Sequence, residues 1–331
     1  MKSHFADRDK YAPWRFVCIS ALVALARASP LNGSGLVVWI AAGAIACAQD
    51  LVPRAYLVTP VGANAVTVST SFFDGSVFTD PTAPLTDFKA RFDTPALSYT
   101  RAVDFFGRSA NVVAAMPYAL GNFRATVAGA DAHEYRSGLA DARVRFSVNL
   151  RGAPAMRPEE FRRWREEFVV GASLTVVVPT GQYDPARLIN PSLHRWAVKP
   201  EVGMARRWGR WALDLYGGVW FFTANDAYFP GTSTRTQQPV GAGETHFSYT
   251  VKARLWMSFD GNFWAGGRTT FNRTENDDYQ RNSRIGGTVS VPLNRRQSLK
   301  FSYSAGAYIS IGGDYKNVSA AWQYSWLSGP K

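Results

Sequence analysis

The chain has 331 residues, of which 14% are aromatic, and it carries a formal net charge of +12 at pH 7. Its two cysteines, Cys18 and Cys47, both precede residue 49, which excludes a disulfide framework or a cysteine-based zinc site in the rest of the chain. Lys and Arg are spread along the sequence without a known nucleic-acid-binding motif, so we expect no nucleic-acid partner.

The N-terminal segment has the features of an export signal. Two apolar runs, residues 16–26 and 36–48, are each shorter than the about 20 residues that a membrane-spanning helix needs. The second run ends in Ala46-Cys47-Ala48, which puts small residues where signal peptidase requires them. We therefore predict a signal peptide at 1–48 and a mature domain at 49–331. A lipoprotein acylated on Cys47 is the alternative.

Alternation of apolar and polar residues with period 2 is the main structural signal in the mature domain. It runs through residues 141–150, 246–259, 298–311 and 317–326. Successive side chains of a strand point to opposite faces, so each segment predicts a strand with one apolar face. Strands of a soluble β-sandwich also alternate but average about 5–6 residues, whereas a barrel strand in a bilayer needs about 9–11. The lengths favour the membrane barrel.

We predict an all-β fold, a closed antiparallel transmembrane β-barrel of about 12 strands. The predicted strands centre near Val68, Leu97, Val113, Phe146, Val176, Val202, Leu215, Tyr249, Trp264, Thr288, Tyr303 and Trp322. Short connections are expected at 104–108, 208–210, 260–261 and 293–297, and long ones at 76–88, 121–138, 179–194, 223–243 and 272–281. Bacterial barrels have short periplasmic turns and long external loops, and an even strand count reproduces that alternation.

One long connection, residues 151–167, falls on the periplasmic side. Its segment 158–167 begins with Pro158 followed by two glutamates, a typical start for a helix. Phe161 and Trp164 are three residues apart and share a face of that helix. We interpret the helix as a cap on the lower rim of the barrel; a partner-binding element is the alternative.

If the apolar faces meet lipid, the polar faces line the lumen. The charged residues predicted to line it are Arg143, Arg145, Lys199, Glu201, Asp214, Lys252, Arg254 and Lys300. Unpaired charges in a dry interior cost several kcal/mol each, so these groups must pair or contact water. A barrel of about twelve strands predicts a narrow passage. The cationic excess favours anionic solutes such as aromatic carboxylates. The alternative is an inert lumen whose charges only hold the barrel together.

Two external segments are candidate sites. The mouth loop at 179–190 is rich in turn formers, and it either folds over the barrel for structural reasons or constricts the pore. The mouth residues are Gly181, Gln182, Tyr183, Asp184, Arg187, Asn190 and Arg195. The second segment is a charge cluster of Arg268, Glu275, Asp277, Asp278, Arg281 and Arg284. Its acids could bind a hard cation, but we prefer pairing with neighbouring arginines and expect no metal.

Catalysis has little support in the sequence. The chain has four histidines and lacks both a Gly-x-Ser-x-Gly elbow and a metal-ligand spacing, so we expect no enzyme, no catalytic residue and no cofactor. We interpret His246 as a solvated residue at the barrel rim. A lipid hydrolase that pairs His246 with a serine is the least favoured alternative.

Several motifs resemble one family. They are the mouth loop 179–190, Arg195-Trp196, Lys199-Pro200-Glu201-Val202-Gly203, residues 217–226, Gly266-Gly267-Arg268, residues 275–278 and 280–284, and Gly312-Gly313-Asp314. Together they resemble the outer-membrane proteins of the MetA-pathway of phenol degradation family, over residues 52–326. The resemblance implies an outer-membrane transporter linked to aromatic-compound catabolism. Expected partners are outer-membrane lipids, lipopolysaccharide, the barrel assembly machinery and a small-molecule solute. A structural or adhesive surface barrel is the alternative.

Overall fold

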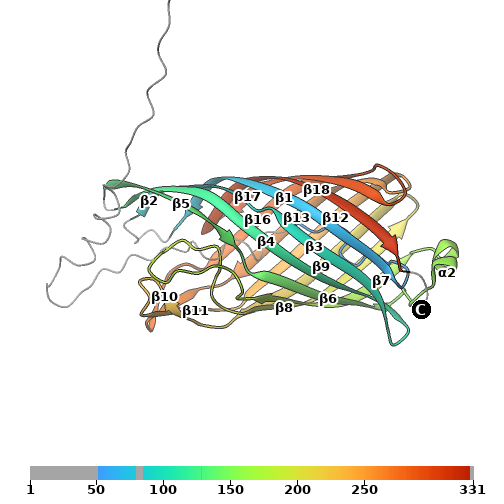
Figure 1. Ribbon diagram of the computed structural model, residues 1–331, viewed down its shortest axis with the longest axis horizontal. Coiled ribbons are helices and arrows are strands. Elements are labelled where there is room, and N and C mark those ends of the chain that lie inside the picture. Colours follow the sequence, from blue (N-terminus) through green and yellow to red (C-terminus); the bar gives the residue numbers. More distant parts are fainter. Residues whose placement is uncertain (1–50, 80–84, 128, 329–331) are drawn as a thin grey trace, which may run out of the picture. The chain divides into compact units, whose positions relative to one another are not determined.

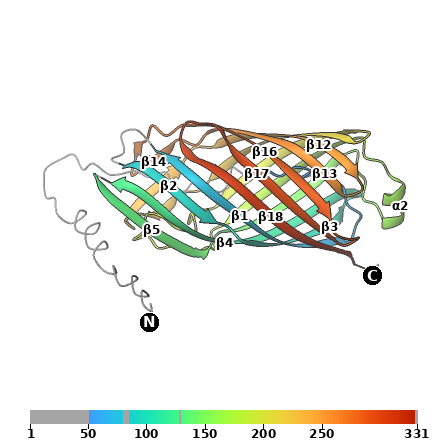
Figure 2. The ribbon, with the colours of Figure 1, turned by 90° about the horizontal axis from the view of Figure 1, so that it is seen from above.

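The computed structural model describes residues 51–79, 85–127 and 129–328, and the predicted signal peptide lies outside them. Within these residues, one antiparallel sheet closes into a barrel, because its last strand pairs with its first from Ala63↔Leu327 to Phe78↔Gly312 (Figure 1). Figure 2 shows these two strands side by side along the wall. No helix among the described residues is long and apolar enough to cross a membrane.

The described residues form a barrel wall of twelve strands, as predicted, when interrupted strands are counted once. Its strands are β1 (Ala63–Phe78), β2 (Leu85–Asp93), β3 (Ala96–Phe105), β4 (Arg108–Val127), β5 (Ala130–Leu139), β6 (Ala142–Arg151), β7 (Phe168–Val178), β8 (Ala197–Trp208), β9 (Trp211–Phe222), β12 (Val240–Lys252), β13 (Leu255–Gly266), β16 (Gln280–Pro292), β17 (Gln297–Ile309) and β18 (Gly312–Leu327). β2 and β3 both pair with β1 and β4, so they form one interrupted crossing. β5 and β6 likewise both pair with β4.

The two faces of the wall differ as the alternation predicts. Apolar side chains such as Val202, Phe259 and Phe301 are 59%, 64% and 49% exposed on the outer face. Polar side chains from neighbouring positions, including His246, Ser248 and Asp260, are fully buried in the interior. The outer face therefore suits contact with lipid.

A charge placed on the outer face is expected to hinder assembly. Phe301→Arg or Trp322→Arg would put a guanidinium against lipid, at a cost of about 2–4 kcal/mol near the bilayer midplane. Ser302→Arg and Gln323→Arg, at the adjacent inward positions of β17 and β18, are the matched controls and should be tolerated. Heat-modifiable migration in gels measures the folded fraction. Equal tolerance of both sets would show that the faces are assigned wrongly.

Two predicted connections are wrong. Residues 121–138 were expected to be a long loop, but β4 continues to Val127 and β5 returns from Ala130 in unbroken register. The predicted turn at Asp260–Gly261 lies in the middle of β13, and the chain instead turns at Ala253 and Arg254. Aspartate is common in turns, but the Asp260 carboxylate is buried against the His246 and Thr288 side chains.

The connections differ at the two ends of the barrel. At one end, residues 152–167 contain the helix α2 (Pro158–Arg163), which stops four residues before the predicted end because the backbone is already extended at Trp164. The expected long loops at 223–243 and 272–281 contain parts of a small separate sheet at the opposite end. It consists of β10 (Asn225–Tyr228), β11 (Ser233–Gln237), β14 (Thr269–Phe271) and β15 (Thr274–Glu275).

Candidate functional site

The segment that precedes β1 lies inside the barrel. The Tyr56 ring rests on Gly171 of β7 and Gly203 of β8, which face each other in the sheet. A Cβ atom added at Gly171 or Gly203 would lie 2.4 Å or 2.2 Å from a ring carbon, so only glycine leaves room for the ring. The ring also meets Tyr216 edge-on, with the centroids 5.2 Å apart. Tyr56 and Val58 are consequently buried within the lumen.

Side chains from several strands bind the backbone of this segment, which we call the lumen segment (residues 51–62). Arg145 of β6 donates to the Ala55 carbonyl at 3.1 Å, and the Ala55 amide donates to the Tyr216 hydroxyl at 3.0 Å. The Arg54 guanidinium reaches β12, where it donates to Ser248 at 3.2 Å and Thr250 at 2.9 Å. These contacts fix the segment across the interior.

An ionic network joins the lumen segment to the wall. The Tyr56 hydroxyl donates to the Glu201 carboxylate at 3.1 Å. Glu201 also pairs with Lys199 at 2.6 Å and with Arg145 at 3.4 Å. Lys199 lies 3.6 Å from Glu244, so the network continues from β8 to β12. Glu201 is therefore the group on which the lumen segment and two wall cations converge.

The same network ends at His246, which was predicted to be a solvated rim residue. That prediction is wrong: His246 is fully buried, with Nδ1 2.9 Å from Asp260 and Nε2 3.3 Å from Glu244. Asp260 in turn accepts a hydrogen bond from Thr288 at 2.8 Å. Both ring nitrogens face carboxylates, which leaves neither of them to a serine hydroxyl.

Apolar clusters lie on both sides of the network. Toward α2, Val58 of the lumen segment packs with Ala153, Met156, Val169 and Ala205, and the partly buried Phe161 and Trp164 pack against this cluster. That contact favours α2 as a cap on the periplasmic rim. Toward the other end, a second cluster is formed by Val177, Ala197, Trp220, Val240 and Trp264, with Leu193 and Phe222 beside it. Together with the lumen segment, these clusters narrow the lumen along β7–β13.

The mouth loop is anchored at the end of the barrel opposite α2. The Asp141 carboxylate, between β5 and β6, accepts hydrogen bonds from the Gly181 amide at 3.0 Å, the Ser192 hydroxyl at 2.6 Å and the Leu193 amide at 2.9 Å. Asp184 and Arg187 pair within the loop at 2.8 Å, and the Gln182 amide donates to Leu139. These bonds hold the loop against the end of β5.

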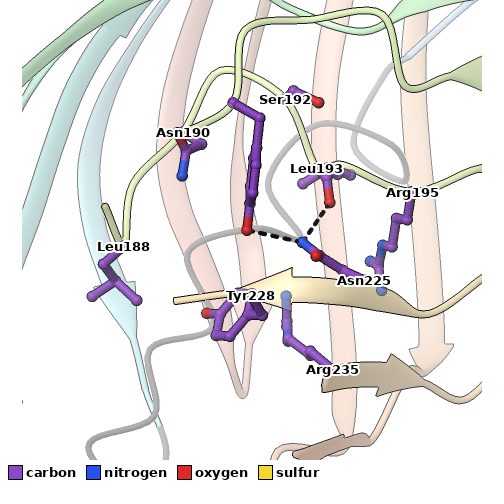
Figure 3. A pocket seen from close by; sticks show the side chains of 9 residues that line it. Leu188, Asn190, Ser192, Leu193, Arg195, Asn225, Tyr228 and Arg235 are labelled. Atoms are coloured by element: carbon purple, nitrogen blue, oxygen red, sulfur yellow. Dashed lines mark hydrogen bonds between the residues drawn. The ribbon is translucent and has the colours of Figure 1, made fainter. Parts of the chain in front are cut away.

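A small pocket lies beneath this loop (Figure 3). Asn225 of β10 donates to the Tyr183 hydroxyl and to the Leu193 carbonyl, each at 3.1 Å. Two buried guanidinium groups line the pocket: Arg195 stacks over Phe222, and Arg235 over Tyr228 at 5.3 Å. The pocket thus combines cations with aromatic rings at the mouth of the barrel.

The residues of the predicted charge cluster have different partners and lie in different places. Glu275 and Asp277 pair with Arg268, at 2.9 Å and 3.6 Å, rather than with Arg281 or Arg284. Asp278 is buried and accepts from the Thr269 amide and hydroxyl. Arg284 lies inside the barrel and donates to the Tyr315 carbonyl, and Arg281 is exposed beside Tyr279. Among the described residues, no group of His, Cys, Asp and Glu is placed to hold a metal ion.

Some of the predicted lumen residues lie in the interior, and others are exposed at the end of the barrel. Arg145, Lys199, Glu201 and Asp214 lie in the interior with the lumen segment, and Arg143 and Lys300 occupy inward positions of β6 and β17. The prediction for Arg254 is wrong, because it lies in the exposed turn after β12 and donates to the Asn294 carbonyl at 2.7 Å. Lys252, at the end of β12 beside this turn, is also exposed. Sequence reasoning missed the lumen segment; the inward glycines Gly171 and Gly203, which accommodate the Tyr56 ring, are the signal that could have indicated it.

Comparisons with known proteins agree with this architecture. The COG4313 outer membrane channel from Pseudomonas putida F1 has a TM-score of 0.70 and 18% identity, over 84% of this chain and 100% of that one. The Ralstonia pickettii toluene transporter TbuX has a TM-score of 0.39 and 8% identity, over 80% and 90% of the two chains. No curated protein matched. The barrel is of the outer-membrane type.

A family model, described as "Putative MetA-pathway of phenol degradation", matches residues 61–326. This match spans the wall from β1 to the aromatic end of β18, and includes the mouth loop and the Glu201 network. The chain belongs to this family.

Proposed function

We propose that the chain passes small aromatic solutes, preferentially anionic ones, across the outer membrane. The observation that carries this proposal is an aromatic inner wall near the extracellular end. Phe73 stacks on Phe92 with centroids 4.6 Å apart, and Phe92 contacts Phe123 at 6.3 Å and Tyr315 at 5.3 Å. Offset rings of this kind bind a flat aromatic solute by stacking. The family description supports the same class of solute.

The charges of the interior support a preference for anions. Arg143 and Lys300 lie at inward positions of β6 and β17, and the Glu201 network includes Arg145 and Lys199. Fixed positive charge in a narrow, low-dielectric passage lowers the barrier for an anion. A carboxylate or phenolate on an aromatic ring matches both the cations and the aromatic wall.

The lumen segment is the proposed gate. Its buried residues Tyr56 and Val58 lie in the interior, against β7, β8 and the cluster beside α2, and in this proposal passage requires their displacement. The arrangement around His246 disfavours the lipid-hydrolase alternative, because both ring nitrogens contact carboxylates rather than a serine hydroxyl.

Planar bilayer recordings test the proposed selectivity. Wild type should show a reversal potential that favours anions in a salt gradient, and the Arg143→Gln/Lys300→Gln variant should lose much of that preference. Arg91→Gln, which removes an exposed extracellular charge paired with Asp74, is the matched control. A folded wild-type protein that neither conducts nor admits benzoate in liposome swelling would favour the structural or adhesive barrel instead.

We also propose export with cleavage after Ala48, outer-membrane assembly by the barrel assembly machinery, and contact with lipopolysaccharide. Leu51, close to the expected new N-terminus, lies near Gly286 on the inner wall. Cleavage at this position would leave an N-terminus inside the barrel. Mass spectrometry of the protein from outer membranes should find a chain that starts at Gln49; a chain that retains residues 1–48 would contradict the proposal.

A further inference from the structure

Basic residues gather at the end of the barrel that carries α2. Most turns and strand ends there contribute at least one: Arg108, Arg151, Arg157, Arg162, Arg163, Arg165, Arg206, Arg207, Arg210, Lys252, Arg254, Arg295 and Arg296. The acidic residues of the same region are fewer: Asp104, Glu159, Glu160, Glu166 and Glu167. A large share of the positive charge therefore lies at the periplasmic rim.

One of these cations, Arg206, stands on the lipid-facing side of the wall. On β8, Val202, Met204 and Trp208 are exposed on the outer face, whereas Gly203 faces the Tyr56 ring inside. Arg206 shares the outer face because strand residues alternate, and it is exposed. Its partners in register are Phe168 and Leu213, both apolar.

Arg101 of β3 has the same setting on another part of the wall. It follows Leu97 and Tyr99, which are 57% and 40% exposed on the outer face. Its partner in register is Asn64, which in turn lies opposite Trp326 near the end of β18. The Tyr99 and Trp326 rings lie 6.3 Å apart. Arg101 is therefore level with a group of aromatic rings of the kind that marks a lipid–water boundary.

Neither guanidinium makes a hydrogen bond or an ion pair with another residue of the described chain. An exposed arginine beside interfacial aromatics has its apolar stem in lipid and its head at the depth of the lipid phosphates. The guanidinium geometry matches a phosphate oxygen pair, and the surrounding basic turns favour a net negative headgroup.

We propose that Arg101 and Arg206 each bind the phosphate of an anionic phospholipid in the periplasmic leaflet. The lipid-facing position of both side chains, within the wall rather than on α2, favours a lipid over an acidic periplasmic protein. The other rim arginines add a positive electrostatic potential that attracts anionic headgroups around the barrel.

Native mass spectrometry of the full mature chain in detergent, titrated with phosphatidylglycerol, tests this. Arg101→Gln and Arg206→Gln should each weaken phosphatidylglycerol binding about fivefold, the effect of about 1 kcal/mol for one basic residue near an anionic surface. The double Arg→Lys variant should retain most of the binding. Arg281→Gln, which removes an exposed arginine beside an aromatic ring at the opposite end, is the control and should leave binding unchanged.

Three results would overturn the proposal. The first is equal phosphatidylglycerol binding by wild type and by the folded Arg101→Gln/Arg206→Gln variant. The second is an equal loss of phosphatidylcholine binding, which would assign the contacts to phosphate in general. The third is displacement of the lipid by millimolar inorganic phosphate, which would indicate a free-anion site. Heat-modifiable migration confirms that each variant is folded before it is titrated.

Discussion

Replacement of Tyr56 by alanine is expected to open the lumen. The substitution removes the buried ring, worth about 1.5–3 kcal/mol, and its hydrogen bond to the Glu201 carboxylate, worth about 1.5–3 kcal/mol. A loss of this size should raise the population of the displaced lumen segment by at least about a hundredfold, since each 1.4 kcal/mol is a factor of ten. The wall remains intact because Tyr56 is not part of a strand. Planar bilayer recordings should show far more frequent open events.

Two variants identify the cause of such an opening. Tyr56→Phe keeps the ring on Gly171 and Gly203 but lacks the hydroxyl, and it should give an intermediate open probability. Tyr303→Ala removes a tyrosine from the lipid-facing side of β17, where it is 51% exposed, and should leave conductance unchanged. If folded Tyr56→Ala conducts like wild type, the lumen segment is not the gate.

The alternation in the sequence was sufficient to predict the wall, because the face of each residue depends only on its parity along a strand. The β12–β13 hairpin shows the limit of that signal. Its turn at Ala253–Arg254 preserves the parity from Phe247 to Phe259, so two strands look like one. The position of the turn, and with it the position of Arg254, could not be read from the pattern.

The interior could be predicted in part. Parity placed Arg145, Lys199 and Glu201 on the inner face, but it could not show that they meet, because that depends on register between strands. Register also brings Gly171 opposite Gly203, and the two glycines together leave space for the Tyr56 ring. The lumen segment itself has no periodic pattern, and its position depends on side chains contributed by distant strands.

Replacement of Glu201 by leucine is expected to destabilise both the wall and the docked lumen segment. The carboxylate is 7% exposed and interacts with Lys199, Arg145 and the Tyr56 hydroxyl. Removing one member of a buried ionic group leaves the opposite charges uncompensated, which costs about 3–5 kcal/mol. Glu201→Gln keeps an acceptor for Tyr56 but loses the charge, and should cost less. Denaturant unfolding in detergent micelles measures the free energy of unfolding.

A second substitution at Lys199 separates the ionic effect from simple loss of packing. In Lys199→Met/Glu201→Leu, Glu244 keeps its contact with His246, and Arg145 keeps its hydrogen bond to the Ala55 carbonyl. Much of the uncompensated charge is thereby removed, so the double variant should be more stable than Glu201→Leu alone. The open probability should nevertheless stay high, because Tyr56 has lost its carboxylate acceptor in both variants. Strictly additive losses in the double-mutant cycle would show that Lys199 and Glu201 do not act as a pair, and that Glu201 contributes mainly through its contact with the lumen segment.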